Sequence, residues 1–288
     1  MKVARSIAEV EKRPRAVAIG MFDGVHPGHR RVLQAVLDSD LAPTVITFDP
    51  HPRLVLGYGV ELLATLERRL ELFEEAGVEE TLVLEFGHEL QQLEPEEFVG
   101  RILRAMGTQV VVAGDDFRFG HRRRGDLALL EANGLSVVTI DQVDGVSSTR
   151  IRDYLHAGDI AGAAAMLGRP AELDGIVVVG DERGGTLGFP TANLAVDPPL
   201  LVPAFGIYAG AARGGSAAIS IGTNPHYGGL ERRIEAHLLD FSGDLYGQRL
   251  VVELWQRLRD ERAFESEADL VAQIALDVEQ ARAAERPI

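Results

Sequence analysis

The hydrophobic pattern of the chain changes once, near residue 170, and this change is the strongest constraint on the fold. Before it, apolar runs rich in β-branched residues alternate with segments of helical period. The expected strands are 16–19, 44–48, 81–86, 110–113 and 136–140, and the expected helices are 32–37, 66–76, 96–106, 126–132, 149–157 and 160–168. Strands that alternate with helices predict an α/β domain whose parallel sheet is covered on both faces.

From Leu173 onward, strands follow one another with only Gly, Pro and Asp turns between them. They are expected at 176–179, 206–211, 217–221, 233–241 and 250–255. Short strands in this pattern predict a mainly antiparallel β-barrel. A terminal helix is expected at about 266–283, with Leu270, Ile274 and Val278 on one stripe. Because Gly168 and Pro170 stop the preceding helix, we expect two domains, 1–168 and 169–288.

Composition excludes several classes of protein. The chain has no cysteine, which rules out disulfides and thiolate metal sites and suits a reducing cytoplasm. It shows no secretory h-region and no apolar run of membrane-spanning length, so we expect a cytoplasmic protein. The formal charge of −15 opposes binding of nucleic acid or anionic lipid. We therefore expect small-molecule partners, no nucleic acid, no membrane, and a monomer or weak homo-oligomer.

Two histidines, His26 and His29, lie where the strand at 16–19 gives way to a helix. Ligands of open parallel sheets bind beyond the carboxyl ends of strands, and a helix N-terminus attracts phosphate. Gly24 and Gly28 would let the backbone approach such a ligand closely. The histidines could donate hydrogen bonds to phosphoryl oxygens, or they could simply cap the helix. The motif alone leaves both interpretations open.

A second element, VSSTRIRDYL at 146–155, favours the phosphate interpretation. Ser147, Ser148 and Thr149 stand at an expected helix start, with Arg150 and Arg152 close behind. Arginines at a helix N-terminus oppose the helix dipole unless an anion is bound there. Hydroxyl and guanidinium groups at this point therefore indicate an anion pocket, and the two elements together could bind a triphosphate.

HPGH with SSTRIR resembles the HxGH nucleotidyltransferase superfamily, which attacks the α-phosphate of ATP and releases pyrophosphate. With TFDPHPR at 47–53 and GDDFRFG at 114–120, the chain resembles the adenylyltransferase half of the bacterial bifunctional riboflavin kinase and FMN adenylyltransferase family. The resemblance implies that the β,γ-phosphates bind Ser148, Thr149 and Arg152. It implies that the remaining ATP-site residues are Phe22, Asp23, Gly24, His26 and His29.

The same resemblance places Asp116 and Phe119 at the flavin site of the adenylyltransferase. The Phe119 ring could lie against the isoalloxazine, and the Asp116 carboxylate could orient a hydrogen-bond donor. The alternative for Phe117 and Phe119 is ordinary core packing, which for either residue alone is the more common outcome.

The segment GDERGGTLGFPTANL at 180–194 carries the main motif of the second half. In extended backbone, Thr191 and Asn193 share one face, and their neutral oxygens suit a Mg²⁺ ion that takes its negative ligands from ATP. The glycines of this segment suit a loop that folds over phosphate. The segment resembles the flavokinase signature, which implies Mg²⁺ and ATP binding by Thr191 and Asn193 and places Gly188 at the ATP site.

The catalytic base is expected in RRIEAHLLDF at 232–241, where alternation puts Glu235, His237, Leu239 and Phe241 on one face. A glutamate in an otherwise apolar strand needs a partner or a function. Glu235 matches the base of the family, which deprotonates the ribityl 5′-hydroxyl, and a salt bridge to Arg232 or Arg233 is the alternative. His237 is expected to pack or to line the substrate site.

These observations predict an enzyme that phosphorylates riboflavin with ATP to FMN, then adenylylates FMN with ATP to FAD and pyrophosphate, with Mg²⁺ in both steps. One alternative keeps only the adenylyltransferase active, because Gly185 and His226 depart from residues usual in the family. Others are a flavin-binding regulator without turnover and an adenylyltransferase for another phosphate ester.

Overall fold

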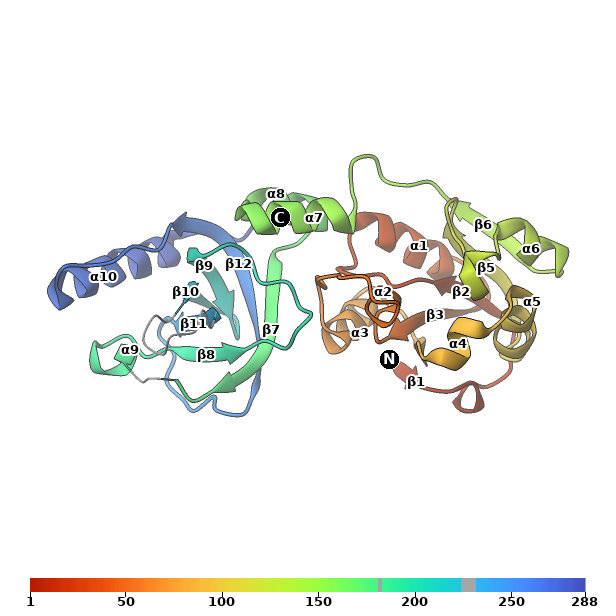
Figure 1. The fold of residues 1–288 in the computed structure, drawn as a ribbon, viewed down its shortest axis with the longest axis horizontal. Helices are drawn as coiled ribbons and strands as arrows, with labels where there is room; N and C mark the ends of the chain where they lie inside the picture. The colour runs from red at the N-terminus through yellow and green to blue at the C-terminus, as the bar shows by residue number, and fades with distance from the viewer. Residues whose placement is uncertain (181–182, 224–231, 288) are drawn as a thin grey trace. The chain divides into compact units, whose positions relative to one another are not determined.

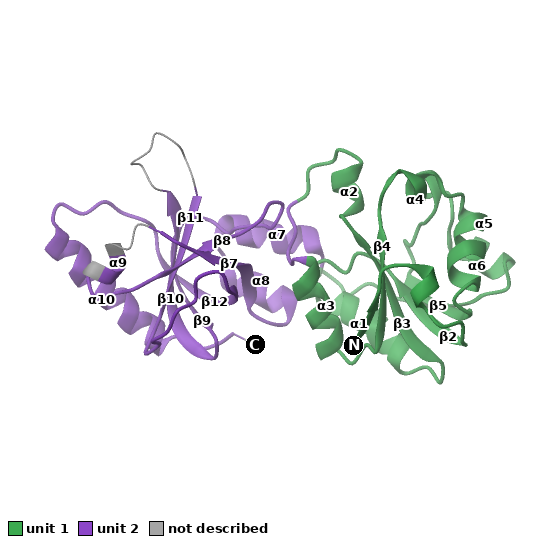
Figure 2. Ribbon diagram, turned by 90° about the horizontal axis from the view of Figure 1, so that it is seen from below, with its two compact units in different colours: residues 1–60, 66–146 green, residues 61–65, 147–288 purple. Residues whose placement is uncertain are grey.

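A computed structural model describes residues 1–180, 183–223 and 232–287. The chain divides into two compact units (Figures 1 and 2). The first comprises residues 1–60 and 66–146, and the second comprises residues 61–65 and 147–288. Each unit has its own hydrophobic core.

The first unit is built on a parallel sheet with strand order β1-β4-β3-β2-β5-β6. Its strands are β1 (Lys2–Ala4), β2 (Arg15–Ile19), β3 (Ala42–Asp49), β4 (Glu80–Glu85), β5 (Thr108–Gly114) and β6 (Ser136–Ile140). Its α-helices are α1 (Pro27–Leu37), α2 (Pro52–Val55), α3 (Leu66–Glu75), α4 (His88–Gln92), α5 (Pro95–Phe98) and α6 (Leu127–Ala132). A π-helical segment, Val99–Arg104, and 3₁₀ turns at Ile7–Glu9 and His121–Arg123 complete the unit.

The strands of this sheet bury side chains on both faces, as the alternation of strands and helices predicts. Val17 and Ile19 of β2 join one core cluster, which includes residues of α5 and α6. Ala16 and Ala18 of the same strand join a second cluster, to which α1 and α3 contribute. The β-branched runs are therefore strands, buried in the middle of the sheet and partly exposed at the edge strand β6, and the predicted parallel sheet is confirmed.

The second unit begins with helices α7 (Ser148–Ala157) and α8 (Ile160–Leu167) and continues into a closed antiparallel barrel. The barrel order is β10-β11-β8-β7-β12-β9, and a long helix, α10 (Glu267–Ala283), follows the last strand. The strands are β7 (Ala171–Val178), β8 (Ala192–Ala195), β9 (Gly206–Ala212), β10 (Gly215–Thr223), β11 (Arg232–Leu238) and β12 (Arg249–Arg259), and the single-turn helix α9 is Arg183–Thr186. The predicted barrel and terminal helix are confirmed.

Several details differ from the sequence-based expectation. Strand β1 was not expected because three residues are too few to show a pattern, yet it pairs with β4. Strand β8 was not expected either, although it bridges β7 and β11. Strand β11 ends at Leu238, and Asp240 has a φ of +57°, so Leu239 and Phe241 do not continue the predicted alternation.

Helices α7 and α8 pack with the barrel. Ile151 and Leu155 of α7, and Ile160 and Ala163 of α8, belong to the same buried cluster as the barrel strands. The second compact unit therefore begins at residue 147, apart from the short segment 61–65. The boundary between the two functional domains at 168/169 stays a prediction. Within the described ranges, no helix has both the length and the apolar character needed to cross a membrane.

Candidate active sites

The loop between β2 and α1 carries the histidine pair. His26 is the N-cap of α1, and its Nδ1 accepts a long hydrogen bond of 3.4 Å from the backbone N–H of His29. The two imidazole rings stack with their centroids 3.6 Å apart. His26 therefore does cap the helix, and the capping geometry also brings both rings together at the helix N-terminus.

The backbone of this loop adopts conformations that cost free energy. Phe22 and Val25 have φ values of +51° and +42°, and Gly24 has a φ of +81°. A left-handed conformation is unusual for a β-branched residue, and strained residues of this kind cost about 1–3 kcal/mol each. The Phe22 ring packs edge-on against His29, with centroids 5.4 Å apart. The surrounding contacts thus hold the loop in a shape that its sequence alone does not favour.

Burial determines the protonation of the two histidines. It lowers the pKa of His26 to about 4, and it lowers the pKa of His29 well below the usual value, with His26 adding to the effect. Both rings are therefore neutral at pH 7. Because His26 Nδ1 accepts a hydrogen bond, its proton lies on Nε2, where it can be donated to an anionic oxygen. The Nδ1 atom of His29 is buried and has no partner among the described residues.

The loop after β5 carries the two residues predicted for the flavin site, and they differ in their exposure to solvent. Asp116 is exposed, whereas Phe119 is 6% exposed and packs against Phe98 and Phe117, with centroids 5.5 and 5.6 Å away. A Cβ on Gly125 would lie 2.8 Å from the Phe119 ring. The geometry thus matches the core-packing alternative for Phe119, and the half-buried Phe117 covers one of its faces.

The SSTRIR segment forms the start of α7, one residue earlier than expected. The Ser147 side chain accepts the backbone N–H of Arg150 at 3.2 Å and so caps the helix. Ser148 and Thr149 are the first residues of the helix. Arg152 donates from Nε to the carbonyl oxygen of Glu61 at 2.6 Å.

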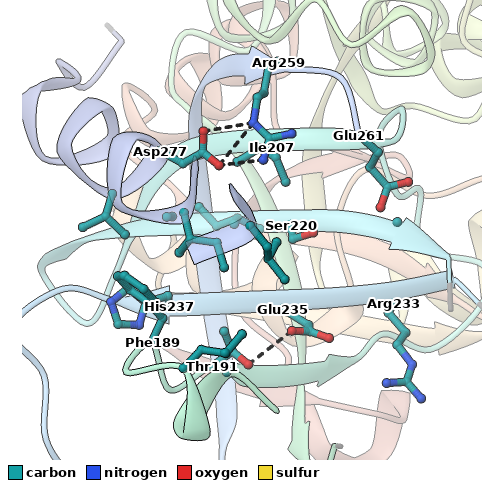
Figure 3. Close-up of a pocket in the computed structure, with 18 of the residues that line it drawn as sticks. Phe189, Thr191, Ile207, Ser220, Arg233, Glu235, His237, Arg259, Glu261 and Asp277 are labelled. Carbon is teal, nitrogen blue, oxygen red and sulfur yellow. Dashed lines mark hydrogen bonds and ion pairs between the residues drawn. The ribbon is translucent and has the colours of Figure 1, made fainter. Parts of the chain in front are cut away.

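The barrel unit contains a cavity of about 440 Å³ (Figure 3). One wall is polar and comes from β8, the residue just before it and β11, with Thr191, Asn193 and Glu235 lining the cavity. The opposite wall is apolar and comes from α10, through the predicted stripe of Leu270, Ile274 and Val278. The cavity therefore combines a polar end with a surface suited to a flat apolar group.

Strand pairing brings the polar residues together. Glu235 lies opposite Asn193 in the β11–β8 ladder, and Thr191 Oγ1 donates a hydrogen bond of 3.3 Å to the Glu235 carboxylate. A Cβ on Gly180 would lie 2.2 Å from the Asn193 amide nitrogen. Any larger residue at position 180 would therefore displace the Asn193 side chain. The predicted alternation is confirmed over 232–238, where the even-numbered Ile234, Ala236 and Leu238 are buried.

The edge of the cavity is formed by the segment before β8. His237 Nδ1 lies 2.7 Å from the carbonyl oxygen of Pro190, and its ring contacts Phe189 edge-on. A Cβ on Gly184 would lie 2.4 Å from the Phe189 carbonyl oxygen, and Gly188 has a φ of +88°. His237 therefore packs and lines the cavity, as expected. His226, the other position noted in the sequence, lies outside the described residues.

Two pairs of residues at the cavity were not found by sequence reasoning. Arg259 of β12 donates from Nε and Nη2 to the Asp277 carboxylate of α10, at 3.0 and 2.7 Å. Burial raises the pKa of Glu261, whose carboxylate would lie 1.7 Å from a Cβ on Gly222. The sequence does contain one signal of the ion pair, because Asp277 is an acidic residue beside the apolar stripe of the terminal helix.

The donor set at Thr191 and Asn193 fits the proposed Mg²⁺. No group of three or more His, Asp or Glu side chains capable of holding a metal occurs in residues 1–180, 183–223 and 232–287. A hydroxyl and an amide oxygen, with the Glu235 carboxylate beside them, suit an ion that arrives with most of its negative ligands on a nucleotide.

Comparison with known proteins agrees with both halves of this description. A family model described as FAD synthetase matches residues 8–152, and one described as riboflavin kinase matches residues 167–285. The chain is 34% identical over 294 residues to the bifunctional riboflavin kinase/FMN adenylyltransferase of Bacillus subtilis, covering 94% of this chain and 92% of that protein. It is 35% identical over 312 residues to the protein of the same name from Escherichia coli, covering 98% and 97%.

A solved structure is similar over the same length. The crystal structure described as a macrolide-efflux protein from Streptococcus pneumoniae matches with a TM-score of 0.85 and 30% identity, covering 97% of this chain and 98% of that one. The FAD synthetase model covers the parallel sheet, the riboflavin kinase model covers the barrel, and the curated relatives match over nearly the whole chain. The chain belongs to the family of bifunctional riboflavin kinase/FMN adenylyltransferases.

Proposed function

We propose that this chain performs both reactions of its family. The barrel transfers the γ-phosphoryl group of ATP to the 5′-hydroxyl of riboflavin, giving FMN and ADP. The parallel-sheet domain then joins the AMP moiety of a second ATP to FMN, giving FAD and pyrophosphate. The observation that best supports the kinase step is the cavity of the barrel, where Thr191, Asn193 and Glu235 face an apolar wall of α10.

In the kinase step, the Glu235 carboxylate accepts the proton of the ribityl hydroxyl as its oxygen attacks the γ-phosphorus. Thr191 orients this carboxylate by donating a hydrogen bond to it. Thr191 and Asn193 would hold Mg²⁺, which offsets the charge of the ATP phosphates, and Gly188 would lie at the phosphates. The apolar wall of α10 would receive the isoalloxazine ring.

In the adenylyltransferase step, a phosphate oxygen of FMN attacks the α-phosphorus of ATP, and pyrophosphate leaves. The nucleophile is already an anion, so this step needs no general base. A neutral His26 can donate from Nε2 to the α-phosphate oxygens, on which charge accumulates, and His29 would assist it. The loop residues Phe22, Asp23 and Gly24 would hold the histidines in place.

The remaining assignments in this step follow the resemblance of the motifs. Ser148, Thr149 and Arg152 would bind the β,γ-phosphates that leave as pyrophosphate, and Asp116 would orient the flavin. Phe119, which is buried behind Phe117, would support the flavin site from beneath. Residues 1–168 would supply the adenylyltransferase and residues 169–288 the kinase. Cytoplasmic riboflavin, ATP and Mg²⁺ would then suffice for FAD synthesis by a monomer or weak homo-oligomer.

The test is a flavin product profile. Purified protein is incubated with ATP and Mg²⁺ together with either riboflavin or FMN, and the flavins are separated chromatographically. FAD from both substrates, with FMN as an intermediate from riboflavin, is the expected result. FAD from FMN alone would support a single active site, and flavin binding without ATP consumption would support a regulator.

A further inference from the structure

A buried arginine, Arg69, belongs to helix α3, which contacts the histidine loop through Phe73 and Phe22. Its side chain is 2% exposed, and it is among the largest fully buried side chains of the described residues. Removing a guanidinium group from water is unfavourable unless charges and hydrogen bonds compensate for the loss of hydration. Arg69 is not among the residues that the sequence motifs identify, so the position of this charge needs its own explanation.

The neighbours of Arg69 come from the loop after β2, from the last residues of β3 and from α3 itself. Its Nη2 donates to the carbonyl oxygen of Phe48 at 3.1 Å, next to Asp49. Burial lowers the pKa of the guanidinium, and the negative charges of Asp23, Asp49 and Glu67 act in the opposite direction, with Asp23 the largest. The Nε atom is buried and has no hydrogen-bond partner among the described residues.

Helix α3 also supports the same loop through Phe73, one turn after Arg69. Phe73 is fully buried, and its ring meets Phe22 edge-on with centroids 5.7 Å apart. Phe22 in turn contacts His29. Arg69 and Phe73 thus lie on one face of α3, the first near the charge of Asp23 and the second against the adjacent ring.

Asp23 lies in the strained part of this loop. It follows Phe22 and precedes Gly24 and Val25, all three of which have positive φ, and it is only 3% exposed. An uncompensated carboxylate here would also repel a nucleotide polyphosphate, because buried charges are weakly screened. A buried cation beside Asp23 can stabilise the strained loop and can also reduce the repulsion between the Asp23 carboxylate and a polyphosphate.

We propose that Arg69 is a positioning residue for the adenylyltransferase, which holds Asp23 and the 22–26 loop in the conformation that directs His26 and His29 at the nucleotide. This inference rests on the proposed function of that site. Arg69 acts through Asp23 and does not itself touch the substrate. The Nε atom of Arg69 has no hydrogen-bond partner in the described residues. The guanidinium therefore keeps one N–H group that can form a new hydrogen bond if the loop shifts when ATP binds.

The experiment compares Arg69→Met, Arg69→Gln and Arg69→Lys in the full chain. FAD formation from FMN is expected to fall by about 30-fold or more in kcat/KM for ATP in the Met and Gln variants, and to stay within about 5-fold in the Lys variant, which keeps the charge. FMN formation from riboflavin, measured on the same preparations, should not change. The structural control is Leu72→Ala, which removes a buried side chain from the same helix three residues away.

A double-mutant cycle with Asp23→Asn tests the route of the effect. If Arg69 acts through Asp23, adding Arg69→Gln to the Asp23→Asn variant should lower kcat/KM for FAD formation only slightly further. Three results would each overturn the inference. These are additive losses of kcat/KM in the double variant, wild-type FAD synthesis in Arg69→Gln, and a loss of kcat/KM in Leu72→Ala equal to that in Arg69→Gln. Should the Met variant not fold, the Gln and Lys variants decide the matter. A wild-type protein that makes no FAD from FMN would instead refute the proposed function.

Discussion

Asp277 of α10 accepts three hydrogen bonds from Arg259 of β12, and this ion pair fixes the helix that forms the apolar wall of the barrel cavity. The Asp277 side chain is 5% exposed, and Arg259 is 20% exposed. Gln273, one turn earlier on α10, donates a further bond of 2.8 Å to Asp277 (Figure 3 shows the ion pair). Because the pair is largely buried, removing one partner leaves the other poorly compensated.

Replacing Asp277 by Asn should therefore loosen α10 over the cavity. We expect KM for riboflavin in the kinase reaction to rise about 10-fold or more, with a much smaller change in KM for ATP, because Thr191 and Asn193 stand on the opposite wall. The free energy of unfolding should fall by about 2–3 kcal/mol, since the buried guanidinium loses its counter-charge. Steady-state kinetics and denaturant unfolding measure the two effects.

The same helix supplies a matched control. Arg282 binds Asp240 through two hydrogen bonds, but both residues are largely exposed. Asp240→Asn should leave the stability and both KM values near wild type, because exposed ion pairs contribute little. Equal effects of the two substitutions would show that burial is not what gives the Arg259–Asp277 pair its importance.

Glu235→Gln tests the proposed base. A glutamine can still accept the hydrogen bond from Thr191 but cannot accept the proton of the hydroxyl, so kcat for FMN formation should fall about 10²–10⁴-fold. FAD synthesis from added FMN should remain largely intact. Product chromatography from riboflavin and from FMN separates the two activities, and simultaneous loss of both would argue against independent sites.

Gly180→Ala tests the role of the Asn193 amide without altering any polar residue. The added methyl would lie 2.2 Å from the amide nitrogen, so Asn193 must move. We expect KM for the Mg²⁺ complex of ATP in the kinase reaction to rise about 10-fold, while FAD synthesis from FMN stays the same. Gly215→Ala is the control, because a Cβ there meets no atom closer than 3.8 Å.

The low pKa of His26 predicts a pH-dependent stability. Its folded value is about 4 and its unfolded value is 6.5, so between these two pH values the unfolded chain carries a proton that the folded chain does not. Stability is therefore lost as pH falls from 6.5 to 4, by about 3 kcal/mol from His26 alone. Urea unfolding at several pH values should show this slope, and His26→Gln should reduce it. An unchanged slope in that variant would contradict the assignment.

The parts of the sites that depend on local pattern could be predicted from sequence. The apolar run at 16–19 followed by HPGH gave the strand-to-helix junction, and alternation around Glu235 gave its place on a strand face. The spacing of Leu270, Ile274 and Val278 likewise predicted the stripe of α10 that lines the cavity.

The long-range partners could not be predicted in this way. Arg69 approaches Asp23 only because two segments far apart in the chain pack together, and nothing in the local sequence signals that. Strand β8 has four residues, too few for a period, and is defined by its neighbours on both sides. The resemblance of its motif predicted Phe119 at a flavin site, but the burial of its ring depends on Phe98 and Gly125.

Residues 61–65 belong to the compact unit that otherwise starts at residue 147. Leu62 donates to the carbonyl oxygen of Pro199 and accepts from the backbone N–H of Leu201, both at 2.8 Å, and Thr65 bonds to Asp174. During translation this short segment leaves the ribosome long before the strands it will join. Neither unit is thus encoded by one uninterrupted stretch, and a gene fragment starting at codon 147 would produce a barrel that lacks part of its own packing.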